Sequence, residues 1–308
     1  MRKIIERLLI FIIGIPAVFA LVFLLPFYKH LALNIVVIVF SAIGALEFSN
    51  MLEKKNIKIA KIEAIILGVL APLAAVIIVT FLYNPDVISF YAYYQIITHK
   101  NIVFGASLLL GIFWALLSQV FSKKENMGNV INNFAGCISV MIYPGFFMFW
   151  LVLMSEWNNS AAIFFFLLIV FFNDSAAWLF GSLFGKNNRG LISASPNKSI
   201  AGFIGGMLGS VLIAVGAFYL FPVMFPDVFK HIVLKEFTPS LPLAIVLGFF
   251  TGLFATLGDL AESAIKRSCD FKDSGNIMLG RGGILDSIDS IAVAAPVYYL
   301  LFSMYFFK

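Results

Sequence analysis

The sequence has little charge and few of the side chains that usually carry enzyme chemistry in soluble proteins. Only 12% of its 308 residues are charged, against roughly 25% in a typical soluble domain, and 61% are hydrophobic. This composition excludes an ordinary globular enzyme and a disordered chain. Two cysteines make no disulfide framework and have no zinc-ligand spacing. What remains is an integral membrane protein.

Long apolar runs are what the sequence does contain. Nine of them are long enough to cross a bilayer, and they predict an all-α polytopic bundle of about nine transmembrane helices. They cover residues 8–27, 32–50, 64–83, 102–121, 131–154, 161–181, 200–222, 241–264 and 288–307. The runs are continuous, whereas transmembrane strands alternate apolar and polar residues. We expect the first run to remain as a helix and not to be cleaved as a signal peptide.

Basic residues set the predicted orientation. Sixteen of the 21 Lys and Arg residues fall on the side that holds the N-terminus, which places the N-terminus in the cytoplasm and the C-terminus outside. They come in short groups between apolar runs, so no nucleic-acid partner is expected. All three histidines fall on the outer side. We predict one membrane domain over 1–308 in a bacterial-type plasma membrane, with transmembrane helices in 1–155 and a catalytic part in 156–308.

Six acidic residues lie within or at the edge of the predicted spans, where a charge is costly and needs a partner or a function. Glu47 lies near a cytoplasmic helix end with Lys54 and Lys55 beyond it, so we expect it to snorkel or to form a local ion pair. The others lie beside Gly-rich or basic sequence on the cytoplasmic side. They are Asp174, Asp259, Glu262, Asp286 and Asp289.

The first polar stretch runs from Asn173-Asp174 to Gly206 and contains Ser195-Pro196-Asn197-Lys198-Ser199. Ser195 suits a helix cap, with Pro196 in the first turn. A helix N-terminus with a lysine and hydroxyl groups can bind an anion, although capping alone explains the Ser and Pro equally well.

The second polar stretch combines carboxylates, cations and glycines. Asp259, Glu262, Ser263, Lys266 and Arg267 share one broad helical face, and Glu262 with Lys266 is also an ordinary i,i+4 pair. After Lys272-Asp273 come glycines that expose backbone N–H groups, and then Asp286 and Asp289 at a helix start, where the helix dipole alone favours acids. Oxygen ligands beside several cations suit Mg²⁺ on a polyphosphate and indicate transfer at phosphorus.

The motif within this stretch resembles the signature of the phosphatidate cytidylyltransferases, also called CDP-diacylglycerol synthases. It reads Ser263-x-x-Lys266-Arg267-x4-Lys272-Asp273-x-Gly275 and then Gly280-x-Gly282-Gly283-x-x-Asp286-x-x-Asp289. The stretch from Asn173 is similar to an upstream region of the same family. The resemblance covers about the last 140 residues. It implies an enzyme that joins CTP to phosphatidic acid at the cytoplasmic face with Mg²⁺, as a homodimer and with a monovalent cation as a further implied cofactor.

The resemblance also gives expected roles to individual residues. Catalysis is expected from Asp259, Lys266 and Asp286, and metal binding from Asp259, Asp286 and Asp289. Substrate binding is expected from Asn173, Asp174, Ser195, Lys198, Ser199, Ser263, Arg267, Lys272, Asp273, Arg281, Gly282 and Gly283.

The signature departs from the family pattern at four positions. Leu279 replaces Pro, Arg281 replaces His, Ser287 replaces Arg, and Ala201 replaces a Glu before Gly. We hypothesise that Arg281 compensates for the arginine that is absent at Ser287. The alternatives are an inactive paralogue, a lipid-binding scaffold, a CDP-alcohol phosphotransferase and an ion-coupled transporter. The phosphotransferase motif needs aspartates four apart, whereas here the spacing is three, and a transporter would carry polar residues through the membrane depth.

Overall fold

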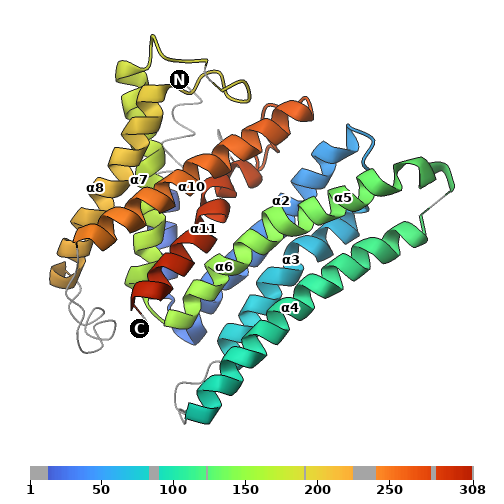
Figure 1. The fold of residues 1–308 in the computed structure, drawn as a ribbon, viewed down its shortest axis with the longest axis horizontal. Coiled ribbons are helices and arrows are strands. Elements are labelled where there is room, and N and C mark those ends of the chain that lie inside the picture. Colours follow the sequence, from blue (N-terminus) through green and yellow to red (C-terminus); the bar gives the residue numbers. More distant parts are fainter. Residues whose placement is uncertain are drawn as a thin grey trace. The chain divides into compact units, whose positions relative to one another are not determined.

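The computed structural model describes residues 13–82, 90–122, 124–190, 192–224, 241–278 and 282–306, and these residues are almost entirely helical (Figure 1). Eight helices in this part of the chain are long and apolar enough to span a membrane. The first expected span, 8–27, is described only from residue 13, as a shorter apolar helix, Ile13–Leu24. The prediction of a polytopic all-α membrane protein is therefore confirmed.

The chain divides into two compact units, which we describe separately. Unit 1 comprises Met1–Asn158 and Cys269–Ser287, and unit 2 comprises Asn159–Ser268 and Ile288–Lys308. Both the N-terminal helices and the segment that carries the middle of the signature thus belong to unit 1. The prediction of a single membrane domain over 1–308, with parts 1–155 and 156–308, stays a prediction.

Unit 1 is built around helix α3. Besides the helix Ile13–Leu24, unit 1 contains the helices α2 (Phe27–Glu53), α3 (Lys61–Ile77), α4 (Phe90–Val120), α5 (Val130–Val140) and α6 (Phe147–Leu153). A Cβ on Gly68 of α3 would run into the side chain of Ala45, and Ser41 donates a hydrogen bond to the Gly68 carbonyl at 2.7 Å. Small residues thus bring α2 and α3 into close contact, as is usual for helices packed in a membrane.

One long membrane helix of unit 1 is interrupted by a wider turn. Between α5 and α6 lies a π-helical segment, Met141–Phe146, that contains Pro144. Proline removes an N–H donor and clashes with the preceding turn, which accounts for the local change from α- to π-geometry. The expected span 131–154 is therefore one continuous but irregular helix.

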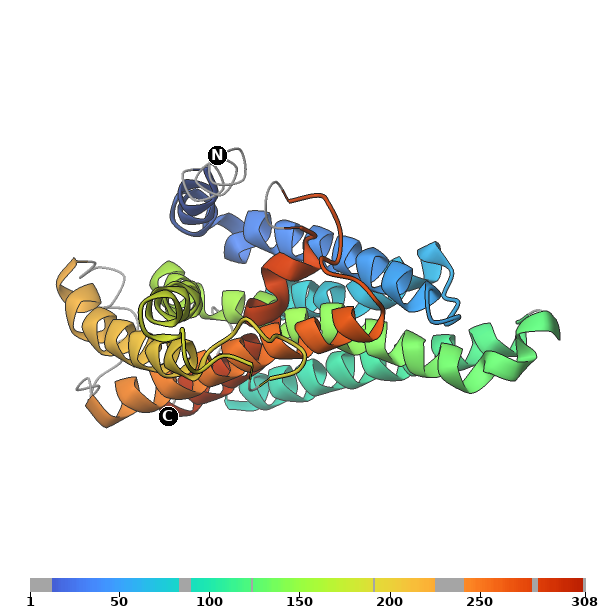
Figure 2. The same cartoon turned by 90° about the horizontal axis from the view of Figure 1, so that it is seen from above.

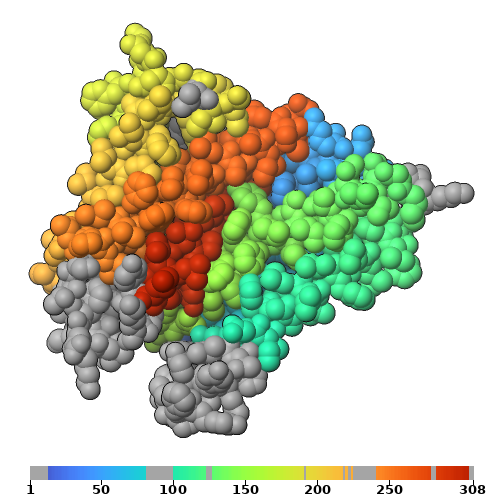
Figure 3. Space-filling model, viewed as in Figure 1, coloured from blue at the N-terminus to red at the C-terminus, as the bar shows by residue number. Residues whose placement is uncertain are grey.

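The outer surface of α4 is strongly apolar. Leu109, Phe113 and Val120 are each more than 60% exposed, and this helix forms the teal band in the space-filling view (Figure 3). Large exposed apolar side chains on this part of the helix are typical of a lipid-facing surface.

Unit 2 consists of α7 (Ser160–Phe184), α8 (Ile200–Met224), α10 (Leu241–Ser268) and most of α11 (Leu285–Phe306). Helix α7 packs against α8, and α10 packs against both. Asn159 begins α7 by accepting a hydrogen bond from the Ala162 N–H at 2.9 Å. At the same end of this bundle, the buried Tyr298 of α11 donates to the Ala162 carbonyl at 2.8 Å.

Candidate functional site

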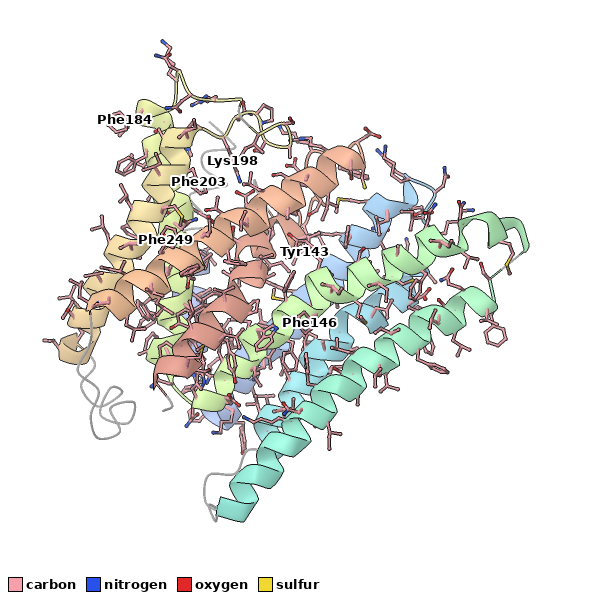
Figure 4. The ribbon with its side chains drawn as sticks, in the orientation of Figure 1. Tyr143, Phe146, Phe184, Lys198, Phe203 and Phe249 are labelled. Atoms are coloured by element: carbon pink, nitrogen blue, oxygen red, sulfur yellow. The ribbon has the colours of Figure 1, made fainter. Side chains whose placement is uncertain are left out.

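The Lys198–Asp259 ion pair joins the two polar stretches of the sequence. Lys198 Nζ lies 2.5 Å from Asp259 Oδ2, and both side chains are about one-third exposed. Figure 4 shows Lys198 in the segment that leads into α8, beside α10. Sixty-one residues separate the two in sequence, so the fold of unit 2 brings the predicted phosphate-binding lysine to the predicted metal-binding aspartate.

Asp259 belongs to a group of four carboxylic acids from three helices of unit 2. Asp289 of α11 is buried and lies within electrostatic range of Asp259 and Glu262 of α10 and of Asp174 of α7. A Cβ on Gly258 would collide with the backbone oxygen of Asp289, which shows how closely α10 and α11 approach at this point. The expectation that these acids gather in one place is met for the members that lie in unit 2.

Lysines balance part of this negative charge. Lys266 Nζ lies 2.5 Å from Glu262 Oε2, and both side chains are buried. The i,i+4 pair expected from the sequence is therefore present. Because each buried charge of this pair has an opposite charge in contact, the desolvation penalty of the pair is offset in part. Arg267 and Lys272 are exposed at and beyond the end of α10.

Oxygen donors of this kind fit Mg²⁺, which prefers carboxylates and keeps several water ligands. Across the described ranges, however, no three acidic, His or Cys side chains are placed to hold one metal ion together. The donor types therefore agree with the predicted cofactor, and the assignment of Asp259, Asp286 and Asp289 as ligands stays a prediction.

Helix α8 begins at Ile200, where the expected span 200–222 begins, and not directly after Ser195. The expected cap at Ser195 is wrong, because Ser195 lies in a turn where its carbonyl accepts from the Lys198 N–H at 3.0 Å. Ser199 is the residue before the helix, and its hydroxyl accepts from the Gly202 N–H at 3.0 Å. The turn keeps Pro196 outside the helix, and Lys198 consequently stands just before the positive end of α8.

Asn173 lies in the packing between helices. It is buried, donates to Thr256 Oγ1 of α10 at 3.0 Å, and accepts from Ser210 Oγ of α8 at 3.5 Å. Ser263 on α10 is also buried. The substrate-binding roles expected for these two residues stay predictions, since the structure shows both within the helix bundle.

Asp286 organises the loop before α11 in unit 1. Its Oδ2 accepts from the Ser274 N–H at 2.8 Å, from Ser274 Oγ at 2.9 Å and from the Gly283 N–H at 2.7 Å. Gly282 has a φ of 103°, a conformation that glycine adopts at little cost. Lys272 and Asp273 are exposed in the same loop, whereas Arg281 and Leu279 lie outside the described residues.

Glu47 is a second residue whose environment differs from the one expected from the sequence. The expected snorkelling or pairing with Lys54 and Lys55 is wrong, because Glu47 is only 5% exposed. Its carboxylate accepts from the backbone N–H groups of Ile284 and Leu285. These partners lie more than 230 residues away in the sequence, and the one available signal was the presence of an acid within a span.

The chain is similar in sequence to a known protein family and to bacterial relatives. A sequence model described as "Cytidylyltransferase family" matches residues 5–305. A phosphatidate cytidylyltransferase of Staphylococcus aureus is 30% identical over 194 residues, which cover 63% of this chain and 67% of the relative. One of Staphylococcus epidermidis is 34% identical over the same length and shares of both chains, and one of Staphylococcus saprophyticus is 29% identical.

Proposed function

The chain belongs to the cytidylyltransferase family, and we propose that it joins CTP to phosphatidate, giving CDP-diacylglycerol and pyrophosphate. The Lys198–Asp259 pair is the observation that carries the proposal. It places a cation that can bind phosphate next to carboxylates that can bind a metal, and nucleotidyl transfer requires both.

In the proposed reaction, an oxygen of the phosphatidate headgroup attacks the α-phosphorus of CTP. A new P–O bond forms, the bond between the α-phosphorus and the bridging oxygen breaks, and pyrophosphate leaves. The attacking phosphate is already anionic at neutral pH, so no histidine base is needed. The protein contributes positioning and charge stabilisation, which are the main sources of catalysis in this class of reaction.

Cationic side chains of unit 2 and of the loop 269–287 would bind the phosphates in this scheme. Lys198 precedes α8 with the Ser199 hydroxyl beside it, and Lys266 is held in place by Glu262. Arg267 and Lys272 are exposed and can reach a soluble nucleotide. The buried lysine would have a fixed position, whereas the exposed cations can adjust to the triphosphate.

We propose Mg²⁺ as the cofactor, held by Asp259 and Asp289 together with Asp286. When bound, it would neutralise charge on the triphosphate and on the departing pyrophosphate. Two further acids lie nearby. Glu262 would fix the position of Lys266, and both Glu262 and Asp174 would add negative potential to the metal site. The monovalent cation stays a prediction of the family resemblance.

The setting of the reaction is part of the same proposal. Eight apolar helices in the described ranges indicate a multi-pass membrane protein, and the positive-inside distribution supports an active site at the cytoplasmic face of a bacterial inner membrane. There, phosphatidate keeps its acyl chains in the bilayer while its headgroup meets soluble CTP. A homodimer is also proposed, on the resemblance alone.

The proposal is tested with purified protein in detergent, CTP, phosphatidate and Mg²⁺, scored for a lipid-soluble cytidine nucleotide. We expect product with the wild type and none with Asp259→Asn. A lipid product formed instead from CDP-diacylglycerol and an alcohol would indicate a phosphotransferase. A wild-type rate in Asp259→Asn would remove this residue from the site.

A further inference from the structure

Glu47 of α2 caps the N-terminus of a different helix, α11. Its Oε1 accepts from the Ile284 N–H at 3.0 Å, and its Oε2 accepts from the Leu285 N–H at 2.9 Å. The first N–H groups of a helix have no partner within that helix, and a carboxylate is a favourable acceptor for them. A buried side chain of α2 therefore supplies the cap at the start of α11.

Ser274 connects Glu47 to Asp286. Its Oγ lies 3.0 Å from Glu47 Oε2 and 2.9 Å from Asp286 Oδ2, and it accepts from the Asp286 N–H at 3.3 Å. A hydroxyl group has one hydrogen to donate, so the two carboxylates share one donor. Any displacement of Glu47 would therefore change the hydrogen bonding of Asp286.

The loop leaves room for this carboxylate by placing glycines against it. A Cβ on Gly275 or on Gly283 would run into the Glu47 carboxylate. Figure 2 shows this loop running beside α2. These two glycines thus permit the close approach of the backbone to Glu47, which a larger residue would prevent.

Two weaker contacts attach the same loop to the end of α2. Lys55 Nζ lies 2.7 Å from Asp270 Oδ2, and Lys54 Nζ lies 4.2 Å from the centre of the Phe271 ring. Both members of the Lys55–Asp270 pair are exposed, so this pair contributes little. Glu47 is the buried attachment, and it contacts the part of the loop nearest to Asp286.

We propose that Glu47 is a positioning residue for cytidylyl transfer. It holds the start of α11 and, through Ser274, the orientation of the Asp286 carboxylate, without touching substrate. The inference rests on the proposed function for one point, namely that Asp286 takes part in the reaction. The contacts of Glu47 themselves do not depend on it.

The test replaces Glu47 with Gln, which has nearly the same size but presents an NH₂ group to one of the two backbone donors. We expect kcat to fall by about 10- to 100-fold, the range seen when residues that orient a metal ligand are lost. KM for CTP and for phosphatidate should stay within about threefold of the wild type, because the interactions that bind the substrates equally in the ground state and the transition state are unchanged. In an Asp286→Asn background, Glu47→Gln should have no further effect on kcat.

Glu156→Gln is the matched control. Glu156 is also a buried glutamate of unit 1, and it pairs with Lys100, not with the signature loop. We expect this variant to lower the melting temperature at least as much as Glu47→Gln while keeping kcat within about threefold of the wild type. The comparison separates positioning from a general loss of folded protein.

Hydrogen exchange gives a readout that does not depend on activity. The amide hydrogens of Ile284 and Leu285 should exchange faster in Glu47→Gln than in the wild type or in Glu156→Gln. Wild-type exchange at both amides, or a kcat within about twofold of the wild type in Glu47→Gln, would overturn the inference. If the wild type itself forms no product, the proposed function fails, and unchanged exchange would still overturn the role of Glu47 in holding the loop.

Discussion

Replacing Lys198 with Met separates the structural contribution of its ion pair from its proposed catalytic contribution. The pair is short, 2.5 Å, but its side chains are 31% and 35% exposed, so its contribution to stability is at most about 1 kcal/mol. Losing a cation that stabilises charge in the transition state costs about 2.7–4 kcal/mol, or about 100- to 1,000-fold in kcat. We therefore expect a large loss of activity with little change in melting temperature.

The assay measures kcat and KM for CTP alongside thermal unfolding in detergent. Lys198→Arg should keep part of the activity, because it keeps the charge. Lys186→Met is the control, since Lys186 is an exposed lysine just after α7, and it should behave as the wild type. A Lys198→Met enzyme whose kcat/KM stays within about threefold of the wild type would refute the role given to this lysine.

Three further predictions concern packing, the altered signature and pH. Gly258→Ala should lower stability by about 1–3 kcal/mol in thermal unfolding, because its Cβ collides with the Asp289 backbone; an unchanged melting temperature would contradict the close packing. Arg281→His should lower activity and Ser287→Arg should restore it in that background; a harmless Arg281→His refutes the compensation. The ion pair with Lys55 lowers the pKa of Asp270. The pair therefore stabilises the fold at pH values above the ordinary carboxyl pKa, and this stabilisation is lost as the pH falls through the lowered pKa of Asp270. Because both side chains of the pair are exposed, this stabilisation is small, and Asp270→Asn should shift the unfolding curve at neutral pH only slightly; a large shift would count against this.

Apolar run length predicted the helices of this protein well. Seven expected spans lie largely within described helices from α3 to α11, and the span 32–50 lies within α2. Continuous hydrophobicity over about 20 residues is a local property that the bilayer itself selects, so it can be read without knowledge of the fold. The irregular turn around Pro144 was not predicted, because tertiary packing decides between a kink and a π-turn.

The candidate site could be predicted only where the partners carry a local signal. Asp259 and Lys198 stood out as charges in an apolar sequence, and the structure brings them together. Glu47 stood out in the same way, but nothing near it in sequence indicates the backbone amides that it binds. Pairings between α2 and a loop more than 220 residues later depend on how helices pack, which hydrophobic periodicity does not specify.

Transfer of the cytidylyl group to phosphatidate can be followed by the position of a phosphorus label in the products. Purified protein is incubated with phosphatidate, Mg²⁺ and CTP labelled either at the α- or at the γ-phosphorus. We expect the α-label to enter the lipid fraction and the γ-label to appear in pyrophosphate, in equal amounts. Label from the γ-phosphorus in the lipid, or no labelled lipid from either substrate, would contradict the proposed transfer.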